Sequence, residues 1–421
     1  MEKYSEYQLT DIEWLPQIPK HWNLETLRKF LRMVSVKNHP EKPLLSVTRE
    51  SGVIVRDVES KEENHNFIPE DLSGYKYVEV GDFCINKMKS WQGSYGVSEY
   101  EGIVSPAYYI CKLNGVERRF FSVAIRSINY VSFFAQYSKG IRVDQWDLSP
   151  IGLKTIPFFL PPINEQHSIV SYLYTKCSLL DTLLSNKEKE ISLLQEMKQR
   201  VIADAVTRGV NPNVKFKATN IPWLPEIPEH WSLLRNKSFM RQTDEKVGKR
   251  KDITLLSLTK QGVVVRDLTE GKGKFPKDYE TYLIVKPNNL VFCLFDIDET
   301  PRTVGLVRHD GMLTGAYSNF EIIETKVLPD FAYYYYLQVD DIKGLRPFYT
   351  GLRKVVKANT FAQLRVPVPP LSEQRSIVSY ITERASKIDL LIEKLNKEIE
   401  CIKEYKQRLI SDVVTGQVKV C

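Results

Sequence analysis

The stretch Pro369-Pro370-Leu371-Ser372-Glu373-Gln374 begins a long segment of helical periodicity, and an earlier stretch, Pro161-Pro162-Ile163-Asn164-Glu165-Gln166, begins another. The two glutamates stand 208 residues apart (373 − 165), and so do two lysines further along the segments (406 − 198). No net insertion therefore separates the copies, whereas loops tolerate insertions and deletions. One rigid element is used twice, and this repeat decides the architecture of the chain.

Apolar residues in each segment recur at steps of three and four, which is the pattern of a coiled-coil seam. Asn164 and Ser372 are the predicted N-caps, and Thr415-Gly416 is the predicted stop of the second helix. Each helix should contain about 40 residues and extend about 60 Å at roughly 1.5 Å per residue. The predicted seam residues are Leu173, Cys177, Leu180, Leu184, Ile191, Leu194, Met197 and Val201, and then Ile381, Ala385, Ile388, Ile392, Leu395, Ile399, Ile402, Tyr405 and Leu409.

One seam position differs between the copies, because Lys187 stands where the second helix has Leu395. A lysine here can lie across the seam with its ammonium group in water, or it can fix the register of the pair. If the helices run antiparallel about a pseudo-twofold axis near residue 186, Lys187 faces the neighbourhood of Glu393. We therefore predict an ion pair between Lys187 and Glu393.

Each long segment follows a part of the chain that is also duplicated. The opening Trp14-Leu15-Pro16 returns as Trp223-Leu224-Pro225 at an offset of 209 (223 − 14). At 421 residues the chain exceeds one ordinary core. The sequence predicts an α+β fold, a tandem duplication with two antiparallel coiled-coil helices and a pseudo-twofold axis, divided into a first globular domain (1–162), a first long helix (163–208), a second globular domain (209–370), and a second long helix with a C-terminal tail (371–421).

Composition excludes several classes of protein. The hydrophobic content of 43% and charged content of 26% are those of a globular protein. We expect a cytoplasmic location, because no run of eighteen apolar residues and no apolar signal core follow Met1. The six cysteines show no CxxC spacing, which argues against a structural zinc site. A net charge of +7 is compatible with a polyanionic partner but does not establish one.

Motifs for catalysis are largely missing from the sequence. It contains no GxxxxGK[ST], HExxH or GxSxG motif. One nuclease-like match exists, in which Asp330, Asp341 and Lys343 resemble the PD…(D/E)xK pattern that binds Mg²⁺ and activates water. The first half does not reproduce this pattern. We predict no catalytic or metal site, with a self-contained metal-dependent DNA endonuclease as the alternative.

Two loops carry residues suited to nucleic acid. In Asn86–Ser94, lysines suit phosphates and Gln92 can pair with the major-groove edge of adenine. In Asp296–Thr303, carboxylates can accept from cytosine and Arg302 can reach guanine. Each loop can instead be an ordinary solvated turn. The DNA-binding candidates in these loops are Lys87, Lys89, Trp91, Gln92, Ser94, Asp298, Thr300, Arg302 and Thr303.

A second pair of stretches places a glycine beside cations in both halves. These are Lys139-Gly140-Ile141-Arg142 and Gly351-Leu352-Arg353-Lys354. The cations suit contact with phosphates, or they are simply exposed charge. The candidates here are Lys139, Arg142, Arg353 and Lys354.

The duplicated Pro-Pro-x-(Asn/Ser)-Glu-Gln helix entry and the Trp-x-Pro-x-Ile-Pro-x-His-Trp openings resemble the specificity subunit of type I DNA restriction-modification enzymes, over essentially the whole chain. The resemblance implies two target-recognition domains, each reading one half of a split site in double-stranded DNA, and no catalytic activity. It implies docking of two methyltransferase subunits on the helices and the Trp-Pro openings, and restriction subunits can join. S-adenosylmethionine, ATP and Mg²⁺ are expected on those partners and none on this chain. A coiled-coil scaffold that does not bind DNA is a further alternative.

Overall fold

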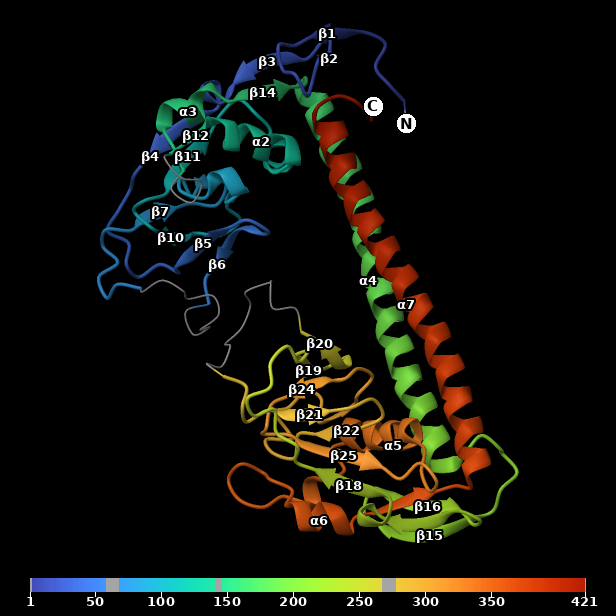
Figure 1. Cartoon of the computed structure of the whole chain (residues 1–421). Coiled ribbons are helices and arrows are strands. Elements are labelled where there is room, and N and C mark those ends of the chain that lie inside the picture. Colours follow the sequence, from blue (N-terminus) through green and yellow to red (C-terminus); the bar gives the residue numbers. More distant parts are fainter. Residues whose placement is uncertain (1, 58–67, 141–145, 267–277, 421) are drawn as a thin grey trace. The chain divides into compact units, whose positions relative to one another are not determined.

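Two matching four-stranded antiparallel sheets organise the chain, one in each of its two units (Figure 1). The first unit comprises residues 1–187 and 396–421, and the second comprises 188–395. Because this division cuts through both long helices, the four consecutive segments stay a prediction. The structure is a computed structural model that describes residues 2–57, 68–140, 146–266 and 278–420.

The two sheets have the same strand order. Counted in chain order, the four strands of each sheet lie side by side as first, fourth, second and third. The orders are β4 (Leu31–Val34), β11 (Tyr109–Leu113), β8 (Phe83–Ile85) and β9 (Tyr95–Val97) in the first unit, and β18 (Met240–Thr243), β25 (Ser318–Ile322), β22 (Leu290–Phe292) and β23 (Val304–Leu306) in the second.

Shorter two-stranded ladders surround each sheet, and every ladder is antiparallel. In the first unit they are β1 (Tyr7–Leu9) with β2 (Gln17–Pro19), β3 (Asn23–Thr26) with β14 (Pro157–Leu160), β5 (Leu45–Thr48) with β6 (Gly52–Val55), β7 (Lys76–Val78) with β10 (Gly102–Val104), and β12 (Ser138–Lys139) with β13 (Asp147–Leu148). In the second they are β15 (Phe216–Ile221) with β16 (Leu224–Pro228), β17 (Ser232–Arg235) with β26 (Arg365–Val368), β19 (Leu256–Thr259) with β20 (Gly262–Val265), and β21 (Leu283–Val285) with β24 (Gly311–Leu313).

Helices pack on these strands and complete each core. The short ones are α1 (Arg118–Ile125), α2 (Ile128–Tyr137) and α3 (Pro150–Thr155) in the first unit, and α5 (Pro329–Asp341) and α6 (Ala358–Gln363) in the second. The long ones are α4 (Ile163–Arg208) and α7 (Leu371–Val414). The first core contains Leu173 of α4 and Val413 of α7, and the second contains Val206 of α4 and Ile381 of α7. Each core therefore uses the start of one long helix and the end of the other.

The predicted α+β duplication with two long antiparallel helices is confirmed. Helix α4 has 46 residues and α7 has 44, so each is about 66–69 Å long at roughly 1.5 Å per residue, somewhat longer than predicted. The helices start at Ile163 and Leu371, so Asn164 and Ser372 lie inside the first turn instead of capping it. The predicted stop is confirmed by Gly416, whose φ of 70° ends the helical conformation. No helix in the described part of the chain is long and apolar enough to span a membrane.

Ion pairs fix the register of the two helices. In the first unit Lys406 Nζ lies 2.6 Å from Asp181, and in the second Lys198 Nζ lies 2.6 Å from Asp389. The positions in both pairs add to 587. The positions of the predicted pair, Lys187 and Glu393, add to 580, which is seven residues or one heptad less than 587. Lys187 in fact pairs with Glu398. The antiparallel direction was therefore correct, whereas the partner was wrong.

The predicted seam residues are buried or half-buried, except at one position that is exposed in both helices. Ile381, Ile388 and Leu395 of α7 are buried. Met197 and Tyr405, which occupy equivalent positions 208 residues apart (405 − 197), are both exposed. A straight helix drifts about 20° per heptad from a strict seven-residue repeat, and this drift turns a seam position outward.

The duplicated Glu-Gln pair ties each long helix to its domain. In the second unit Glu373 Oε2 lies 2.7 Å from His230 Nε2, and its other oxygen accepts from Trp231 Nε1 at 3.1 Å. The Gln374 side chain accepts from the backbone N–H of Leu328 at 2.7 Å, just before α5. The repeated motif is therefore a joint between helix and domain. The first unit makes the same kind of contacts through Glu165 with His21 at 2.8 Å and Gln166 with the backbone N–H of Glu117 at 2.8 Å.

Candidate nucleic-acid interface

Two loops that the sequence presented separately meet in the first unit. The loop Asn86–Ser94 connects β8 to β9, and the segment Ser138–Leu148 follows α2, its residues 141–145 lying outside the described part. The backbone N–H of Leu148 donates to the carbonyl oxygen of Lys87 at 3.1 Å. We call this surface the first loop pair.

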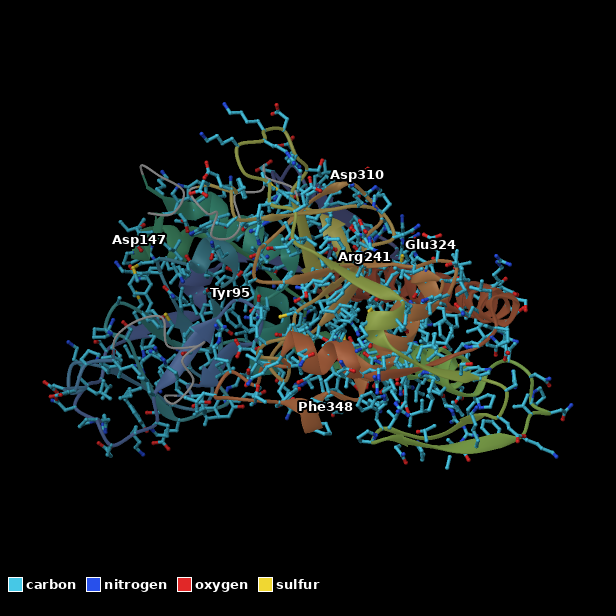
Figure 2. All side chains as sticks on the ribbon, turned by 60° about the horizontal axis from the view of Figure 1, so that its bottom comes forward. Tyr95, Asp147, Arg241, Asp310, Glu324 and Phe348 are labelled. Atoms are coloured by element: carbon cyan, nitrogen blue, oxygen red, sulfur yellow. The ribbon has the colours of Figure 1, made fainter. Side chains whose placement is uncertain are left out.

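The side chains of the first loop pair combine cations and indole rings. Lys87 Nζ lies 2.8 Å from Asp147, a partly exposed residue labelled in Figure 2, and this hydrogen bond raises the pKa of Lys87. The Trp91 and Trp146 rings lie 5.5 Å apart, edge to face. Lys89 is exposed. Positive charge beside aromatic faces suits phosphates and bases together.

The remaining candidates of this half differ in their exposure. Ser94 is buried at the base of its loop, where its carbonyl oxygen accepts from the backbone N–H of Asn86 at 3.0 Å. Gln92 is half-buried, and Lys139 is exposed on β12. Arg142 lies outside the described residues. Ser94 thus closes the loop, whereas Lys139 is accessible.

Sequence reasoning named Lys87 but missed two lysines that act with it, Lys37 and Lys76. Lys76 Nζ donates to the carbonyl oxygen of Tyr108 at 2.6 Å, and the Tyr108 hydroxyl contacts Asn86 Nδ2 at 3.1 Å. Burial, together with the charges of Lys37 and Lys87, lowers the pKa of Lys76. Lys37, Lys76 and Lys87 are separated by 39 positions (76 − 37) and 11 positions (87 − 76), so no local motif predicts that they lie near one another. Together they attract an anion toward the loop.

The same positions on the second sheet carry the second loop pair, formed by the loop Phe295–Thr303 between β22 and β23 and the turn Tyr349–Val355. The backbone N–H of Asp296 donates to the carbonyl oxygen of Arg353 at 2.9 Å, and their side chains form an ion pair at 2.8 Å. The Arg353 guanidinium also lies 5.2 Å from the centre of the Phe295 ring. The candidates Asp298, Arg353 and Lys354 are therefore brought together.

Asp298 is the centre of the charges in this loop pair. It lies 2.9 Å from Arg346 Nε, 3.3 Å from Lys354 Nζ and 3.2 Å from the Tyr349 hydroxyl. The hydrogen bond from Arg346 lowers the pKa of Asp298, while burial and the Asp298 charge raise the pKa of Tyr349 to about 12. Lys354 also pairs with Glu299 at 3.0 Å. Arg346 and Tyr349 were not singled out from the sequence, because they pair with residues about 50 positions away.

Three further candidates hold the second loop in place. The backbone N–H of Thr303 donates to Asp340 at 3.0 Å, and its hydroxyl donates at 2.7 Å. Arg302 contacts the same carboxylate at 3.2 Å, as does Lys343 at 2.9 Å. The Thr300 hydroxyl donates to the backbone of Asp296 within the loop. Contacts of Thr300, Arg302 and Thr303 with DNA stay a prediction, since each already has a structural role.

Backbone strain is concentrated around this second pair. Asp296, Lys343 and Lys354 have φ angles of 47°, 49° and 46°, in the left-handed region. A residue with a Cβ atom pays about 1–2 kcal/mol there. Such strain persists where the surrounding structure enforces it, and it clusters at functional sites. The second loop pair is therefore rigidly held, and its contact with DNA stays a prediction.

Comparison with known proteins agrees with this geometry. A family model described as a type I restriction modification DNA specificity domain matches residues 297–401. The putative type I restriction enzyme MjaX specificity subunit of Methanocaldococcus jannaschii is 25% identical over 435 residues, covering 96% of this chain and 95% of that protein. The chain is thus similar to type I restriction-modification specificity subunits. The MjaVIII specificity subunit of the same organism is 25% identical over 302 residues, covering 69% of this chain and 68% of its own.

Solved structures share the fold of this chain. A chain in a structure of a type I R-M system has a TM-score of 0.67 at 11% identity and covers 95% of this chain and 99% of its own. The HsdS subunit from Thermoanaerobacter tengcongensis has a TM-score of 0.52 at 13% identity, with coverage of 95% and 98%. At these identities the likeness shows the fold alone.

The nuclease-like residues Asp330 and Asp341 do not form a metal site. Asp330 and Asp341 stand at opposite ends of α5, eleven residues apart (341 − 330), or about 16 Å at roughly 1.5 Å per residue, so they cannot share one ion. Asp330 pairs with Arg308. Among the described residues no group of three His, Cys, Asp or Glu side chains could hold a metal. The nuclease alternative is therefore not supported.

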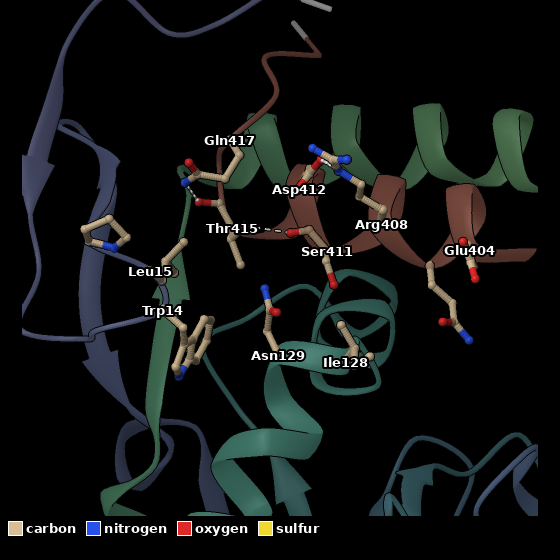
Figure 3. A pocket seen from close by; sticks show the side chains of 12 residues that line it. Trp14, Leu15, Ile128, Asn129, Glu404, Arg408, Ser411, Asp412, Thr415 and Gln417 are labelled. Atoms are coloured by element: carbon tan, nitrogen blue, oxygen red, sulfur yellow. Dashed lines mark hydrogen bonds and ion pairs between the residues drawn. The ribbon is translucent and has the colours of Figure 1, made fainter. Parts of the chain in front are cut away.

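A groove of about 370 Å³ opens in the first unit (Figure 3). Trp14 of the opening motif, Asn129 of α2 and Ser411 of α7 line it. Trp14 is 40% exposed and packs one edge against Phe133, with ring centres 4.8 Å apart. The equivalent Trp223 of the second unit is half-buried. The groove therefore offers an accessible indole beside the end of a long helix.

Proposed function

We propose that this chain is a non-catalytic subunit that reads a bipartite site in double-stranded DNA, one half with each recognition domain. The observation that carries the proposal is that two matching sheets hold unlike loop pairs at equivalent positions. The first pair presents lysines and tryptophans, and the second presents a carboxylate and arginine network. One scaffold with two chemistries suits two different half-sites.

The proposal includes the partners that such a subunit positions. Two adenine-methyltransferase subunits would dock on the long helices and the Trp-Pro openings, and the Trp14 groove supplies an apolar contact of this kind. Those subunits would carry S-adenosylmethionine, while restriction subunits that join would use ATP and Mg²⁺. In this arrangement residues 1–162 and 209–370 are the recognition domains, 163–208 and 371–421 are the connecting helices, and the complex works in the cytoplasm.

Methylome sequencing tests the proposal directly. A host that carries this chain with its methyltransferase should methylate adenine in a split motif with a fixed spacer. The matched strain with this chain deleted, and the methyltransferase retained, should lose methylation at that motif. An unchanged methylome after deletion would contradict the proposal.

Two assays address the alternatives. The purified chain should not cleave DNA with Mg²⁺, whereas cleavage abolished by Asp341→Ala would revive the nuclease. The complex with its methyltransferase should retard duplex DNA that carries the motif. A scaffold that does not bind DNA predicts no retardation of any duplex.

A further inference from the structure

Leu352 stands out among the apolar residues of the second loop pair, because it is fully exposed (103%). It follows Gly351, whose φ of 71° allows a tight turn, and the backbone N–H of Lys354 closes that turn on the Gly351 carbonyl oxygen at 3.2 Å. A leucine in such a turn contacts no core of its own. Single exposed apolar residues are common on surfaces, so exposure alone carries no conclusion.

The turn that carries Leu352 is held firmly. Thr350 and Val355 form an antiparallel bridge at its base. On one side Arg353 pairs with Asp296 at 2.8 Å, and on the other Lys354 pairs with Glu299 at 3.0 Å. The pinned turn presents Leu352 in a fixed place beside the loop Asp296–Thr303, so little further ordering is needed when the leucine is buried on binding.

The sequence repeats this arrangement in the other half. In sequence, Gly351-Leu352-Arg353 corresponds to Gly140-Ile141-Arg142. Residues 141 and 142 lie outside the described part of the chain. The neighbouring loops Asn86–Ser94 and Asp296–Thr303 have almost nothing in common. A feature shared by domains whose reading loops differ suits a property of DNA that does not depend on base identity. Contact with a thymine methyl group depends on the base, whereas stacking between bases does not.

We propose that Leu352 is an apolar wedge that enters the base stack of the half-site read by the second domain, on a turn that the ion pairs of Arg353 and Lys354 hold in place. Burial of the leucine offsets part of the cost of unstacking, which is how apolar side chains distort DNA. The inference rests on the proposed function. It adds that the second domain deforms its half-site as well as reading it.

Fluorescence of 2-aminopurine tests the wedge, because this base brightens when it is unstacked. The complex of the full chain with its methyltransferase is mixed with duplexes that carry the methylated motif, with 2-aminopurine placed at each position of both half-sites in turn. With the wild-type complex, 2-aminopurine fluorescence should increase at one base step of the half-site read by the second domain. Leu352→Ala should lose this signal and bind roughly tenfold more weakly, with an unchanged salt slope because no charge is removed. Leu352→Phe should retain the signal.

Ile323→Ala is the matched control, since Ile323 is exposed just after β25 in the same unit and lies outside both the loop pair and the long helices. It should leave the fluorescence unchanged. An identical signal in wild type and Leu352→Ala would overturn the wedge while leaving the proposed function intact. If replacing thymine with uracil weakens binding as much as Leu352→Ala does, then Leu352 contacts a thymine methyl group and is not a wedge. If the wild-type complex does not bind the methylated motif, the proposed function and the wedge fail together.

Discussion

At the scale of single residues, Asp340 determines the shape of the second reading loop. Its side chain is 2% exposed and accepts from Arg302, Thr303 and Lys343. The sequence pointed to Arg302 as a base contact, because arginine is the usual partner of guanine. It could not show the competing partner, since Asp340 lies 38 positions away (340 − 302) at the end of a helix.

Asp340→Ala should destabilise the second unit by about 3 kcal/mol, because it leaves Lys343 and the buried N–H and hydroxyl of Thr303 without their carboxylate acceptor, while Arg302 keeps its second partner Asp341 at 2.9 Å. The free energy of unfolding, from urea titrations followed by tryptophan fluorescence, measures the loss. Asp310→Ala is the control, since Asp310 is exposed (Figure 2) and should cost less than about 0.5 kcal/mol. Equal urea midpoints for the two variants would show that the network does not support the loop.

At the scale of elements, the long helices show what periodicity can and cannot predict. Steps of three and four residues predicted both helices, the antiparallel direction followed from the duplication, and the seam was largely correct. The register was one heptad wrong, because a seven-residue repeat satisfies every register that differs by seven. Only specific partners such as Lys198 with Asp389 choose among them, and each exposed pair contributes only about 0.2–1 kcal/mol.

Lys187→Leu should stabilise the helix pair by about 1 kcal/mol, because it completes the seam that Leu395 completes in the other copy. The lysine side chain is largely covered, and its ion pair with the more exposed Glu398 is a weak one. Thermal unfolding measures the gain. Lys189→Leu on the exposed face of the same helix is the control and should give none. A lower melting temperature for Lys187→Leu would mean that the ion pair outweighs apolar packing.

A matched insertion of one heptad in both helices should lengthen the DNA spacer and leave both half-sites unchanged. Seven residues add about 10 Å, which corresponds to about three base pairs of duplex. The register requires the insertions to follow Ser192 and Leu395, whose positions add to 587 like those of the ion pairs. The spacer of the methylated motif is read from the methylome.

An insertion in α4 alone is the control for the matched change. It displaces the residues of α4 that follow the insertion from their partners on α7. We therefore expect lower stability and less methylation together. An unchanged spacer in the doubly extended protein would show that helix length does not set the separation of the half-sites.

At the scale of the whole molecule, the duplication was readable from the sequence, and the assembly of each loop pair was not. The loops Asn86–Ser94 and Asp296–Thr303 were predicted because polar residues follow apolar strands, and the structure places each between two strands of a sheet. Their companions came from folding, since contacts such as Lys87 with Asp147 and Asp296 with Arg353 join residues about 60 positions apart. Candidates that proved to be internal supports, such as Ser94 and Thr303, have the same residue types as accessible ones, and only burial separates them.

Substitutions in the two loop pairs should change different halves of the methylated motif. Gln92→Ala should relax one half and Asp298→Ala the other, each by about 1–3 kcal/mol of discrimination at one base pair. Lys139→Ala, which removes an exposed cation, should weaken methylation of all sites about equally. Methylome sequencing of the three variants gives the result. A variant that changes both halves would contradict the assignment of one half-site to each domain.

The twin ion pairs of the helices also bear on the symmetry of the chain. Lys198 with Asp389 and Lys406 with Asp181 are the same contact made twice, with the lysine and the aspartate drawn from opposite copies each time. In a chain of half this length, one lysine and one aspartate would meet their counterparts only across a second molecule. The two copies therefore meet through an isologous contact of the kind that joins a symmetric dimer, here made within one polypeptide.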